Sequence, residues 1–407
     1  MGKDKNLDFS QYINYIALAY AFILPLSRAG ISFFTGMLVL LWLLEGNLVD
    51  KIKSLAKNKI ALALTAFIVF NFISLLWTDD VMATLGYIRR YWYLLPILVF
   101  YTSIQKEFIP KILSAFIFGM FISEIIAYGI FFELWPFNNV TYRNPSPFMH
   151  HIEYSIFLAF TALILLGRIF NEKKIKYKFL YIFFFITISG NLFLTAGRTG
   201  QLAFVLGLFV LALISFKNKI KAFFISLILT VLIIGIAFNV SQTFHERIIA
   251  AKENLASVID KKDYCTSWGG RVGAWIVSKD IIIESPLIGA GLVNNMHEFH
   301  KRIDMNYPEM KCMHESFMHL HNQYLQIFTQ LGIVGFVIFL SIFYQIARLP
   351  IKQLEYKNIK YIYLTVLLFA FVSEVIFHRQ FSMVLFALVV GLLLAQNRIE
   401  NEVSSIK

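Results

Sequence analysis

Residues 319–344 read HLHNQYLQIFTQLGIVGFVIFLSIFY, and this stretch carries the pattern that decides the fold. From Gln323 onward the run is apolar and long enough to cross the ~30 Å hydrocarbon core of a bilayer as a helix. A polar pair, His321 and Asn322, stands directly before it. The stretch therefore predicts a membrane-spanning helix with a titratable imidazole at its water boundary.

Similar apolar runs recur along the whole chain. Of its 407 residues, 58% are hydrophobic and 15% are charged, whereas a soluble domain has about a quarter of its residues charged. We predict an all-α integral membrane protein with about twelve spans, centred near residues 19, 38, 68, 98, 122, 160, 187, 208, 230, 335, 367 and 388. Residues 1–240 should hold nine spans, residues 241–320 a large, mostly helical polar segment, and residues 321–407 the last three spans and the C-terminus.

Lysine marks one side of the predicted membrane. With the N-terminus placed inside, the short inner loops are rich in lysine, as in VDKIKSLAKNK, NEKKIKYK and FKNKIK. The positive-inside rule then puts both termini in the cytoplasm and residues 241–320 outside. The net charge of +12 follows from this lysine belt, which meets anionic lipid head groups, so nucleic acid binding is not expected.

The bases on the outer side are of a different type. The short outer loops hold only arginines, namely Arg28, Arg89, Arg90, Arg143, Arg198 and Arg379. Arginine pairs bidentately with phosphate or carboxylate and keeps its charge in a poorly hydrated site. We expect at least two of them to form an anion site. The alternative is that they contact lipid head groups or pair with Glu133, Glu153 or Glu374.

Two arginines lie in glycine-containing turns. TAGRTGQ places Arg198 between Gly197 and Gly200, and SWGGRVGAW places Arg271 after two glycines and just ahead of a helix expected over 272–284. Small residues let backbone N–H groups approach an oxyanion at the N-terminal end of the following helix. The alternative interpretation is a tight turn with a solvated arginine.

Gly332 and Gly335 follow His321 at helical spacing. On one continuous helix they would lie on the same face as His321, deeper in the membrane. Small residues in membranes usually serve close helix packing. The alternative is a smooth groove that holds the acyl or polyprenyl chain of a lipid.

Cys265 and Cys312 are the only cysteines, and both fall within residues 241–320. On an oxidising face they could form a disulfide, with two free thiols as the alternative. Five histidines crowd the same segment: His297, His300, His314, His319 and His321. Because no CxxC or HExxH element accompanies them, we expect no metal site.

Asp79 and Asp80 form an acidic pair outside the polar segment. The pair could hold a divalent metal, but the favoured interpretation is a cap on a helix that begins near Val81.

The pattern His321-Asn322, nine residues, Gly332, two residues, Gly335 resembles the signature of the O-antigen ligases, within the wider superfamily of ligases and O-antigen polymerases. The likeness also includes about twelve spans, a large late polar loop and the arginine contexts at Arg198 and Arg271. It implies a GT-C-like membrane glycosyltransferase of the bacterial inner membrane with its active site facing the periplasm. Such an enzyme moves a glycan from undecaprenyl pyrophosphate to lipid A-core.

The resemblance also implies roles for individual residues. His321 would be catalytic, Arg198 and Arg271 would bind the pyrophosphate, and Asn322 would be a neighbouring polar contact. The remaining outer arginines are further candidates for substrate binding: Arg28, Arg89, Arg90, Arg143 and Arg379. No cofactor or metal is expected.

The residue types suit that chemistry. Arginines can stabilise the charge of a leaving pyrophosphate, and an imidazole can accept the proton of an acceptor hydroxyl. Direct displacement with inversion is the expected mechanism. A polymerase that uses a lipid-linked glycan as acceptor, a relative that glycosylates protein, and a flippase for lipid-linked sugars remain alternatives.

Overall fold

The structure is a computed structural model that describes residues 9–137 and 140–405. Within these ranges every regular element is a helix, apart from one isolated bridge between Phe137 and Val140. The prediction of an all-α protein is therefore confirmed for the described residues.

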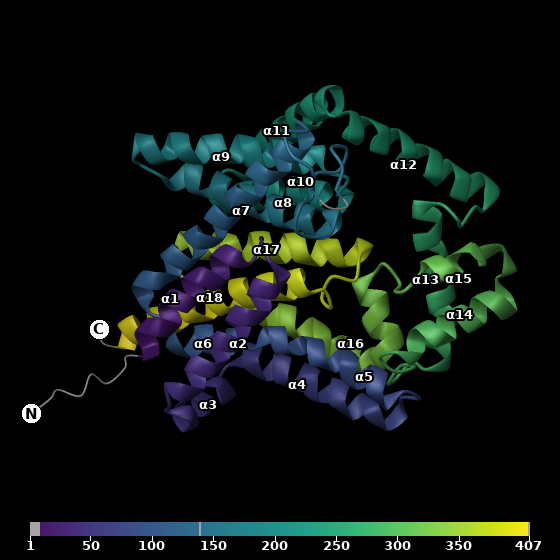
Figure 1. The fold of residues 1–407 in the computed structure, drawn as a ribbon, viewed down its shortest axis with the longest axis horizontal. Helices are drawn as coiled ribbons and strands as arrows, with labels where there is room; N and C mark the ends of the chain where they lie inside the picture. Colours follow the sequence, from purple (N-terminus) through teal and green to yellow (C-terminus); the bar gives the residue numbers. More distant parts are fainter. Residues whose placement is uncertain (1–8, 138–139, 406–407) are drawn as a thin grey trace, which may run out of the picture.

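Fourteen of the α-helices form the main bundle (Figure 1). They are α1 (Phe9–Ile23), α2 (Arg28–Leu44), α3 (Leu48–Ala56), α4 (Lys59–Ile73), α5 (Val81–Ile88), α6 (Pro96–Ser103), α7 (Ile109–Phe131), α8 (His151–Asn171), α9 (Ile175–Leu194), α10 (Arg198–Ser215), α11 (Lys219–Val240), α16 (Gln323–Arg348), α17 (Leu354–Ser373) and α18 (Gln380–Ser405). Short 3₁₀ turns add η1 (Ser74–Trp77), η2 (Arg89–Leu94) and η3 (Lys106–Phe108).

Eight helices of the described chain are long and apolar enough to cross a membrane, or up to nine if a bent pair is counted as one span. They are Lys59–Trp77, Lys106–Phe131, His151–Asn171, Ile175–Leu194, Arg198–Ser215, Lys219–Val240, Gln323–Arg348 and Gln380–Val403. The protein is thus a multi-span membrane protein.

The predicted count of twelve spans is not confirmed. Helices do lie at the other four predicted centres, but α1, α2 and α6 have 15, 17 and 8 residues, fewer than the ~20 that a straight span needs. Helix α17 has 20 residues but carries three charged side chains near its start, Glu355, Lys357 and Lys360. Helix α3 turns away from α2 by 111°.

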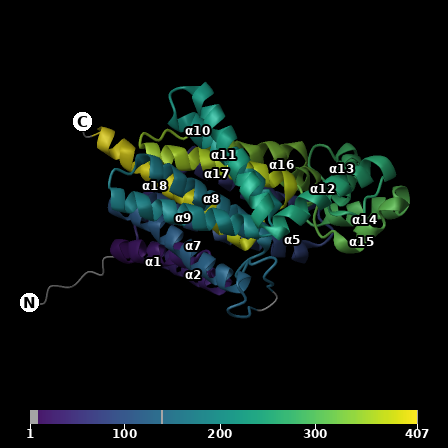
Figure 2. The same ribbon diagram turned by 90° about the horizontal axis from the view of Figure 1, so that it is seen from above.

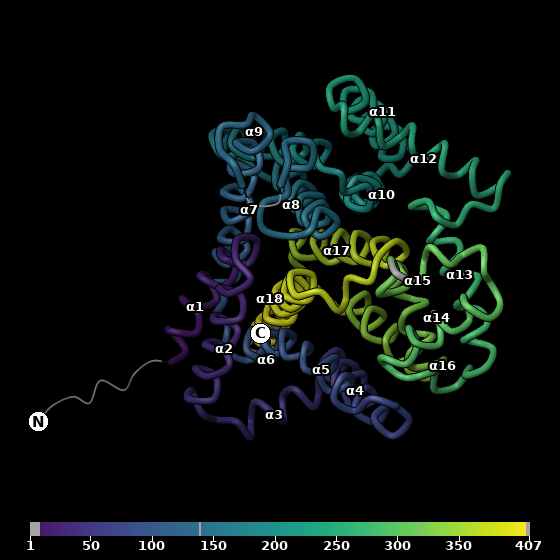
Figure 3. The backbone as a smooth tube through the Cα atoms, turned by 45° about the vertical axis from the view of Figure 1, so that its right-hand side comes forward, coloured from purple at the N-terminus to yellow at the C-terminus, as the bar shows by residue number. Residues whose placement is uncertain are grey.

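Helices α17 and α18 lie in the middle of the bundle, between α7–α11 on one side and α2–α6 on the other (Figures 1 and 3). In α18, 89% of the apolar window is buried inside the protein, against 17% in α11. In the short segment that joins α17 to α18, residues 374–379, the side chains of Glu374, Val375, Ile376 and Phe377 are buried, so packing holds this segment in place.

The polar segment between α11 and α16 has its own small core. It contains α12 (Gln242–Lys261), α13 (Ser267–Glu284), α14 (Asn294–Asn306), η4 (Pro308–Met310) and α15 (Cys312–Ser316). Apolar side chains that include Val277, Phe299 and Met313 are buried there, separate from the bundle core. Helices α13–α15 lie at the end of the molecule opposite the N-terminal end of α1 and the C-terminal end of α18 (Figures 1 and 2).

Polar caps set the starts of several helices. Asp80 caps α5, since its side chain accepts a hydrogen bond from the Ala83 N–H at 2.8 Å. The predicted capping role of Asp80 is confirmed. Asp79 instead accepts a hydrogen bond from the Asn294 side chain at 2.9 Å, which ties α5 to the polar segment.

Two predictions for Arg271 differ from the structure. The resemblance to the ligases implies an arginine that opens the first helix of the polar segment, but α12 precedes α13, so Arg271 lies on the second helix. Helix α13 begins at Ser267, so Arg271 lies inside it rather than ahead of it. Thr266 supplies the start, because its side chain caps the Gly269 N–H and allows the helix to begin before the two glycines.

Candidate active site

His321 lies two residues before the start of α16. Its backbone has φ of 47°, in the left-handed region, and the next residue, Asn322, caps α16 by accepting a hydrogen bond from the Leu325 N–H at 3.1 Å. The Asn322 side chain is buried and serves the helix start.

The imidazole meets Glu374, the first residue after α17. His321 Nδ1 lies 3.2 Å from Glu374 Oε2, and the carboxylate is 1% exposed. An ionised carboxylate only accepts hydrogen bonds, so Nδ1 must carry the hydrogen. His321 Nε2 is then left with a free lone pair, the arrangement that a carboxylate gives to the histidine of a catalytic triad.

Two further basic groups hold the other oxygen of Glu374. His319 Nε2 and Arg379 Nη2 lie 3.4 Å and 3.5 Å from Glu374 Oε1. Burial raises the pKa of the Glu374 carboxyl, but the hydrogen bond from His321 and the electrostatic interactions with His319, His321 and Arg379 outweigh burial and lower the pKa to about 2. Glu374 is therefore a buried anion at neutral pH.

His319 is neutral in this cluster. Burial lowers its pKa to about 4, despite the neighbouring Glu374 charge. Its Nδ1 accepts a hydrogen bond from the His321 N–H at 3.3 Å, so the ring hydrogen is on Nε2, the atom that lies 3.4 Å from Glu374 Oε1. His319 thus supports both the backbone of His321 and the carboxylate.

Arg198 and Arg271 come together beside the cluster, although they are distant in sequence. Both donate to Ser267 Oγ, Arg198 at 3.1 Å and Arg271 at 3.2 Å. Arg271 also donates to the carbonyl oxygen of Ser373, the residue before Glu374, at 3.4 Å. The two cations are therefore held side by side next to the carboxylate that orients His321.

Neither arginine of this pair forms a salt bridge within the part of the chain that the structure describes. No carboxylate oxygen of the described chain lies within 4.0 Å of either guanidinium, and Arg198 Nη1 is buried without a hydrogen-bond partner. Burial lowers the pKa of Arg271, with Glu374 acting in the opposite direction. Adjacent, partly buried cations with spare donors suit a multiply charged anion.

The glycines beside these arginines serve packing. A Cβ on Gly200 would lie 2.2 Å from the Ser155 carbonyl carbon, and the Gly200 N–H already donates to Ser155 Oγ at 3.1 Å. A Cβ on Gly270 would lie 2.6 Å from the ring of Phe317, which in turn packs edge-on against His321 at 4.9 Å between ring centroids. The backbone N–H of Gly200 is thus not free for an oxyanion.

Gly332 does not lie on one continuous helix with His321, so the predicted shared face is wrong. Gly332 has φ 62° and ψ −166°, and it breaks α16. The break lets the Ile333 N–H donate to the Pro286 carbonyl at 2.9 Å. Gly335 is buried, and a Cβ there would lie 3.0 Å from Phe70 of α4. Both glycines lie in close packing contacts.

The other predicted arginines divide into two groups. Arg28, Arg89, Arg90 and Arg379 line one cavity of about 640 Å³, next to the cluster around Glu374. Arg143 lies elsewhere, with its Nε 3.1 Å from the hydroxyl of Tyr142, in an exposed loop.

Cys265 and Cys312 form a disulfide. It joins the start of α13 to α15 and stands two residues before Ser267, the common contact of Arg198 and Arg271. The disulfide thus restrains the part of the polar segment that contacts Arg198 and Arg271.

One group in the described chain has the composition of a metal site. The ligand atoms of His319, His321 and Glu374 lie within 4.8 Å of one another. However, Arg379 Nη2 lies 3.3 Å from His319 Nε2 and 3.5 Å from the carboxylate. A guanidinium in that place competes with a cation, so the geometry favours an ion-pair cluster. His300 and His314 are engaged elsewhere, with Phe317 O and Asp304.

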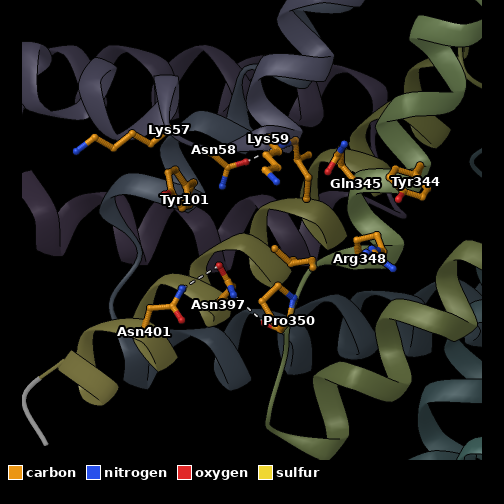
Figure 4. Close-up of a pocket in the computed structure, with 12 residues that line it drawn as sticks. Lys57, Asn58, Lys59, Tyr101, Tyr344, Gln345, Arg348, Pro350, Asn397 and Asn401 are labelled. Carbon is orange, nitrogen blue, oxygen red and sulfur yellow. Dashed lines mark hydrogen bonds between the residues drawn. The ribbon is translucent and has the colours of Figure 1, made fainter.

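Figure 4 shows a second polar pocket, which lies by the start of α4 and the C-terminal parts of α16 and α18, whereas the cluster around Glu374 lies at the N-terminal ends of α16 and α18. The pocket has about 490 Å³ and is lined by Lys57, Lys59, Arg348, Asn397 and other residues, with no histidine or carboxylate among them. It lacks a group suited to proton transfer at neutral pH.

Sequence reasoning missed the central role of Glu374 and His319. Glu374 was considered only as a possible ion-pair partner of an outer arginine, and His319 only as one of five histidines in the polar segment. Arg247 of α12 was also missed; its charge interacts with that of Arg198. A signal did exist, since SEVIFHRQ is a polar interruption between two apolar runs.

The fold and the site define a multi-span membrane protein that holds an oriented histidine and a cluster of arginines at one end of its bundle. Residues 182–340 match the model of the O-antigen ligase family, which confirms the predicted resemblance over a segment that includes Arg198, Arg271 and His321.

Curated proteins agree with this match. The chain is 31% identical over 208 residues to a Rickettsia conorii protein and 28% identical over 248 residues to a Rickettsia bellii protein, both carrying the name "Putative polysaccharide ligase". It is also 28% identical over 232 residues to an uncharacterized Haemophilus influenzae protein. These matches cover 50%, 58% and 54% of this chain and 45%, 55% and 57% of the relatives. The chain thus spans about half the length of the curated relatives it matches.

Proposed function

We propose that this protein is a membrane glycosyltransferase that moves a glycan from undecaprenyl pyrophosphate to a sugar hydroxyl of lipid A-core. In this proposal the lysine-rich end and both termini face the cytoplasm. The polar segment and the site face the periplasm of a bacterial inner membrane. The observation that carries the proposal is His321 held through Nδ1 by buried Glu374, beside the adjacent cations Arg198 and Arg271.

The transfer step uses these groups as follows. The acceptor oxygen attacks the anomeric carbon of the donor sugar while its proton passes to His321 Nε2. The bond from the anomeric carbon to the pyrophosphate oxygen breaks, and its electron pair leaves with undecaprenyl pyrophosphate. Displacement at the face opposite the leaving group inverts the anomeric configuration.

Glu374 and the arginines stabilise the charges that develop in this step. Glu374 holds the imidazole in the tautomer that leaves Nε2 free, and it stabilises the imidazolium that forms. Arg198 and Arg271 meet the charge that grows on the leaving pyrophosphate. Fixed donors in a partly dehydrated site contribute most where charge develops. Each arginine also orients the donor before reaction.

A purified system tests the proposal. The protein in lipid nanodiscs is given a lipid-diphosphate-linked glycan and either lipid A-core or a second lipid-linked glycan. The proposal expects a new glycosidic bond to lipid A-core, detected by mass shift. Elongation of the second lipid-linked glycan alone would mean a polymerase. Movement of the donor across vesicles without any new bond would mean a flippase.

A further inference from the structure

The cavity of about 640 Å³ has no part in the step described above. Its charged lining consists of Arg28, Arg89, Arg90 and Arg379 against a single carboxyl, Glu153. A volume of this size suits one or two sugar units with their substituents. The excess of guanidinium groups indicates an anionic occupant.

Three helices begin at this cavity. Arg28 and Gln380 are the first residues of α2 and α18, and Glu153 lies in the first turn of α8. The N-terminal ends of helices carry partial positive charge and free N–H groups. The helix ends therefore add to the positive potential that the arginines create.

Three of the arginines keep their charge available. Within the described chain, no carboxylate oxygen lies within 4.0 Å of the guanidinium of Arg28, Arg89 or Arg90. Glu153, 3% exposed, accepts a hydrogen bond from Ser382 at 3.2 Å instead. Three of the four cavity arginines thus form no salt bridge with the described residues.

His378 positions Arg90 without adding charge. Its Nε2 lies 3.1 Å from the Tyr87 carbonyl oxygen and so must be the donor, which leaves Nδ1 to accept from Arg90 Nη1 at 3.1 Å. Burial lowers the pKa of His378 to about 3, so the ring is neutral. The ring also stacks on Tyr87 at 3.5 Å between centroids. Arg90 is thereby fixed at the cavity wall with donors to spare.

The cavity adjoins the catalytic cluster through Arg379. Arg379 lines the cavity and contacts both Glu374 and His319. Arg271, in contrast, reaches the same short segment from its other end, at Ser373. The cavity arginines and the Arg198–Arg271 pair therefore adjoin the residues around Glu374 at different positions. A transferase needs two bound substrates with the catalytic imidazole between them, and these two regions could each hold one.

We infer that the cavity is the acceptor subsite and holds the phosphate or carboxylate groups of an anionic glycolipid head group; the inference rests on the proposed transferase function. The donor diphosphate occupies Arg198 and Arg271. The hydroxyl of the anchored acceptor then faces His321.

Binding and kinetics test the inference together. The probe is a fluorescent glucosamine-disaccharide glycolipid with two phosphates, compared with the same lipid after removal of the phosphates, in phosphatidylcholine nanodiscs. The variant Arg28→Gln/Arg89→Gln should raise the Kd for the phosphorylated probe about tenfold or more. It should not change the Kd for the dephosphorylated probe. The KM for the donor should stay within about twofold.

A matched control removes two charges from the polar segment. Lys252 and Lys279 are exposed on α12 and α13, and Lys252→Gln/Lys279→Gln should bind the phosphorylated probe as the wild type does. Equal binding of the phosphorylated probe by the wild type and the cavity variant would overturn the inference, even if transfer occurs. The inference would also be overturned if the cavity variant bound undecaprenyl pyrophosphate more weakly and the phosphorylated probe as tightly as the wild type does. Arginine-dependent binding without any transfer would refute the proposed function and reduce the cavity to an anionic-lipid site, which also overturns the acceptor assignment.

Discussion

Glu374 is the acidic residue at the centre of the candidate site. It is the only acid that contacts His321 in the described chain, and it also holds His319 and Arg379. A buried carboxylate bonded to a histidine orients the ring and stabilises its protonated form. Glu374 is thus a positioning residue, because it acts through His321.

Replacing Glu374 by Gln should lower kcat by about 10²-fold or more, because the amide keeps the shape but cannot stabilise an imidazolium. The KM for the donor should change little, since Arg198 and Arg271 are retained. Steady-state kinetics with the purified protein measure both values. Glu374→Asp, which keeps the charge, should recover part of the rate. An equal rise in KM with kcat unchanged would contradict a role in the chemical step.

Acid should destabilise the protein through the same cluster. The pKa of His319 is lowered to about 4 in the folded protein, so the unfolded chain binds more protons below its ordinary pKa of ~6.5. The stability that this group contributes is present above that value and is lost as the pH falls toward 4. The lowered pKa of Glu374 extends the loss from its ordinary value of ~4.3 down to about 2.

The measurement is the thermal unfolding midpoint in detergent between pH 7.5 and pH 4. His319→Gln should flatten the decline between pH 6.5 and 4, because Gln does not titrate. If the variant and the wild type lose stability in parallel over that range, His319 is not the titrating group.

At the scale of elements, the break in α16 joins the membrane bundle to the polar segment. Gly332 adopts a backbone conformation that essentially only glycine tolerates. A Cβ there would lie 2.3 Å from the Leu287 carbonyl carbon. The loop over 286–291 is therefore fixed against α16, and with it the end of α13.

Gly332→Ala should destabilise the protein by at least about 1–3 kcal/mol from backbone strain alone, with the clash adding to this. Gly235 of α11 is the matched control, because a Cβ there meets nothing within 4 Å. Gly235→Ala should leave the unfolding midpoint unchanged or slightly raised. Equal midpoints for the two variants would contradict the strain argument.

Local signals predicted several elements correctly. The caps and apolar runs predicted α5 with Asp80 before it, and α10 with Arg198 at its start. The break in α16 was not predicted, because it depends on contacts with residues 286–291, which are distant in sequence. The grouping of Arg198 and Arg271 around Ser267 likewise arises from tertiary packing, and only the family resemblance had linked them.

At the scale of the whole molecule, the disulfide ties the polar segment to the site. It closes a loop with a sequence separation of 47, for which chain entropy predicts stabilisation on the order of 4 kcal/mol. Only Thr266 separates Cys265 from Ser267, the shared contact of Arg198 and Arg271, so the orientation of both arginines depends on this bridge.

The variant Cys265→Ser/Cys312→Ser should raise the KM for the donor and make residues 241–320 more sensitive to protease. The helices of the bundle should stay resistant. Treatment of the wild type with a membrane-permeant reductant should reproduce the effect, and the reductant should not alter the double variant. Unchanged donor KM in the variant would show that the bridge does not support the arginines.

The sequence predicted an all-helical membrane protein but not the number of spans. Hydropathy identifies apolar runs, whereas the length of each helix is set by breaks and caps that depend on packing. The run near residue 98 is one example, since α5, η2 and α6 replace a single helix there. The outer arginines other than Arg198 were all given as further candidates for substrate binding, but packing gathers four of them in one cavity and leaves Arg143 outside.

The most direct test of the central claim is the single-turnover transfer rate of His321→Ala with saturating donor and acceptor. The claim predicts a fall of about 10²–10⁴-fold, while the variant folds and binds undecaprenyl pyrophosphate with a Kd close to that of the wild type. A variant that transfers glycan at the wild-type rate would contradict the assignment of His321 as the group that takes the proton.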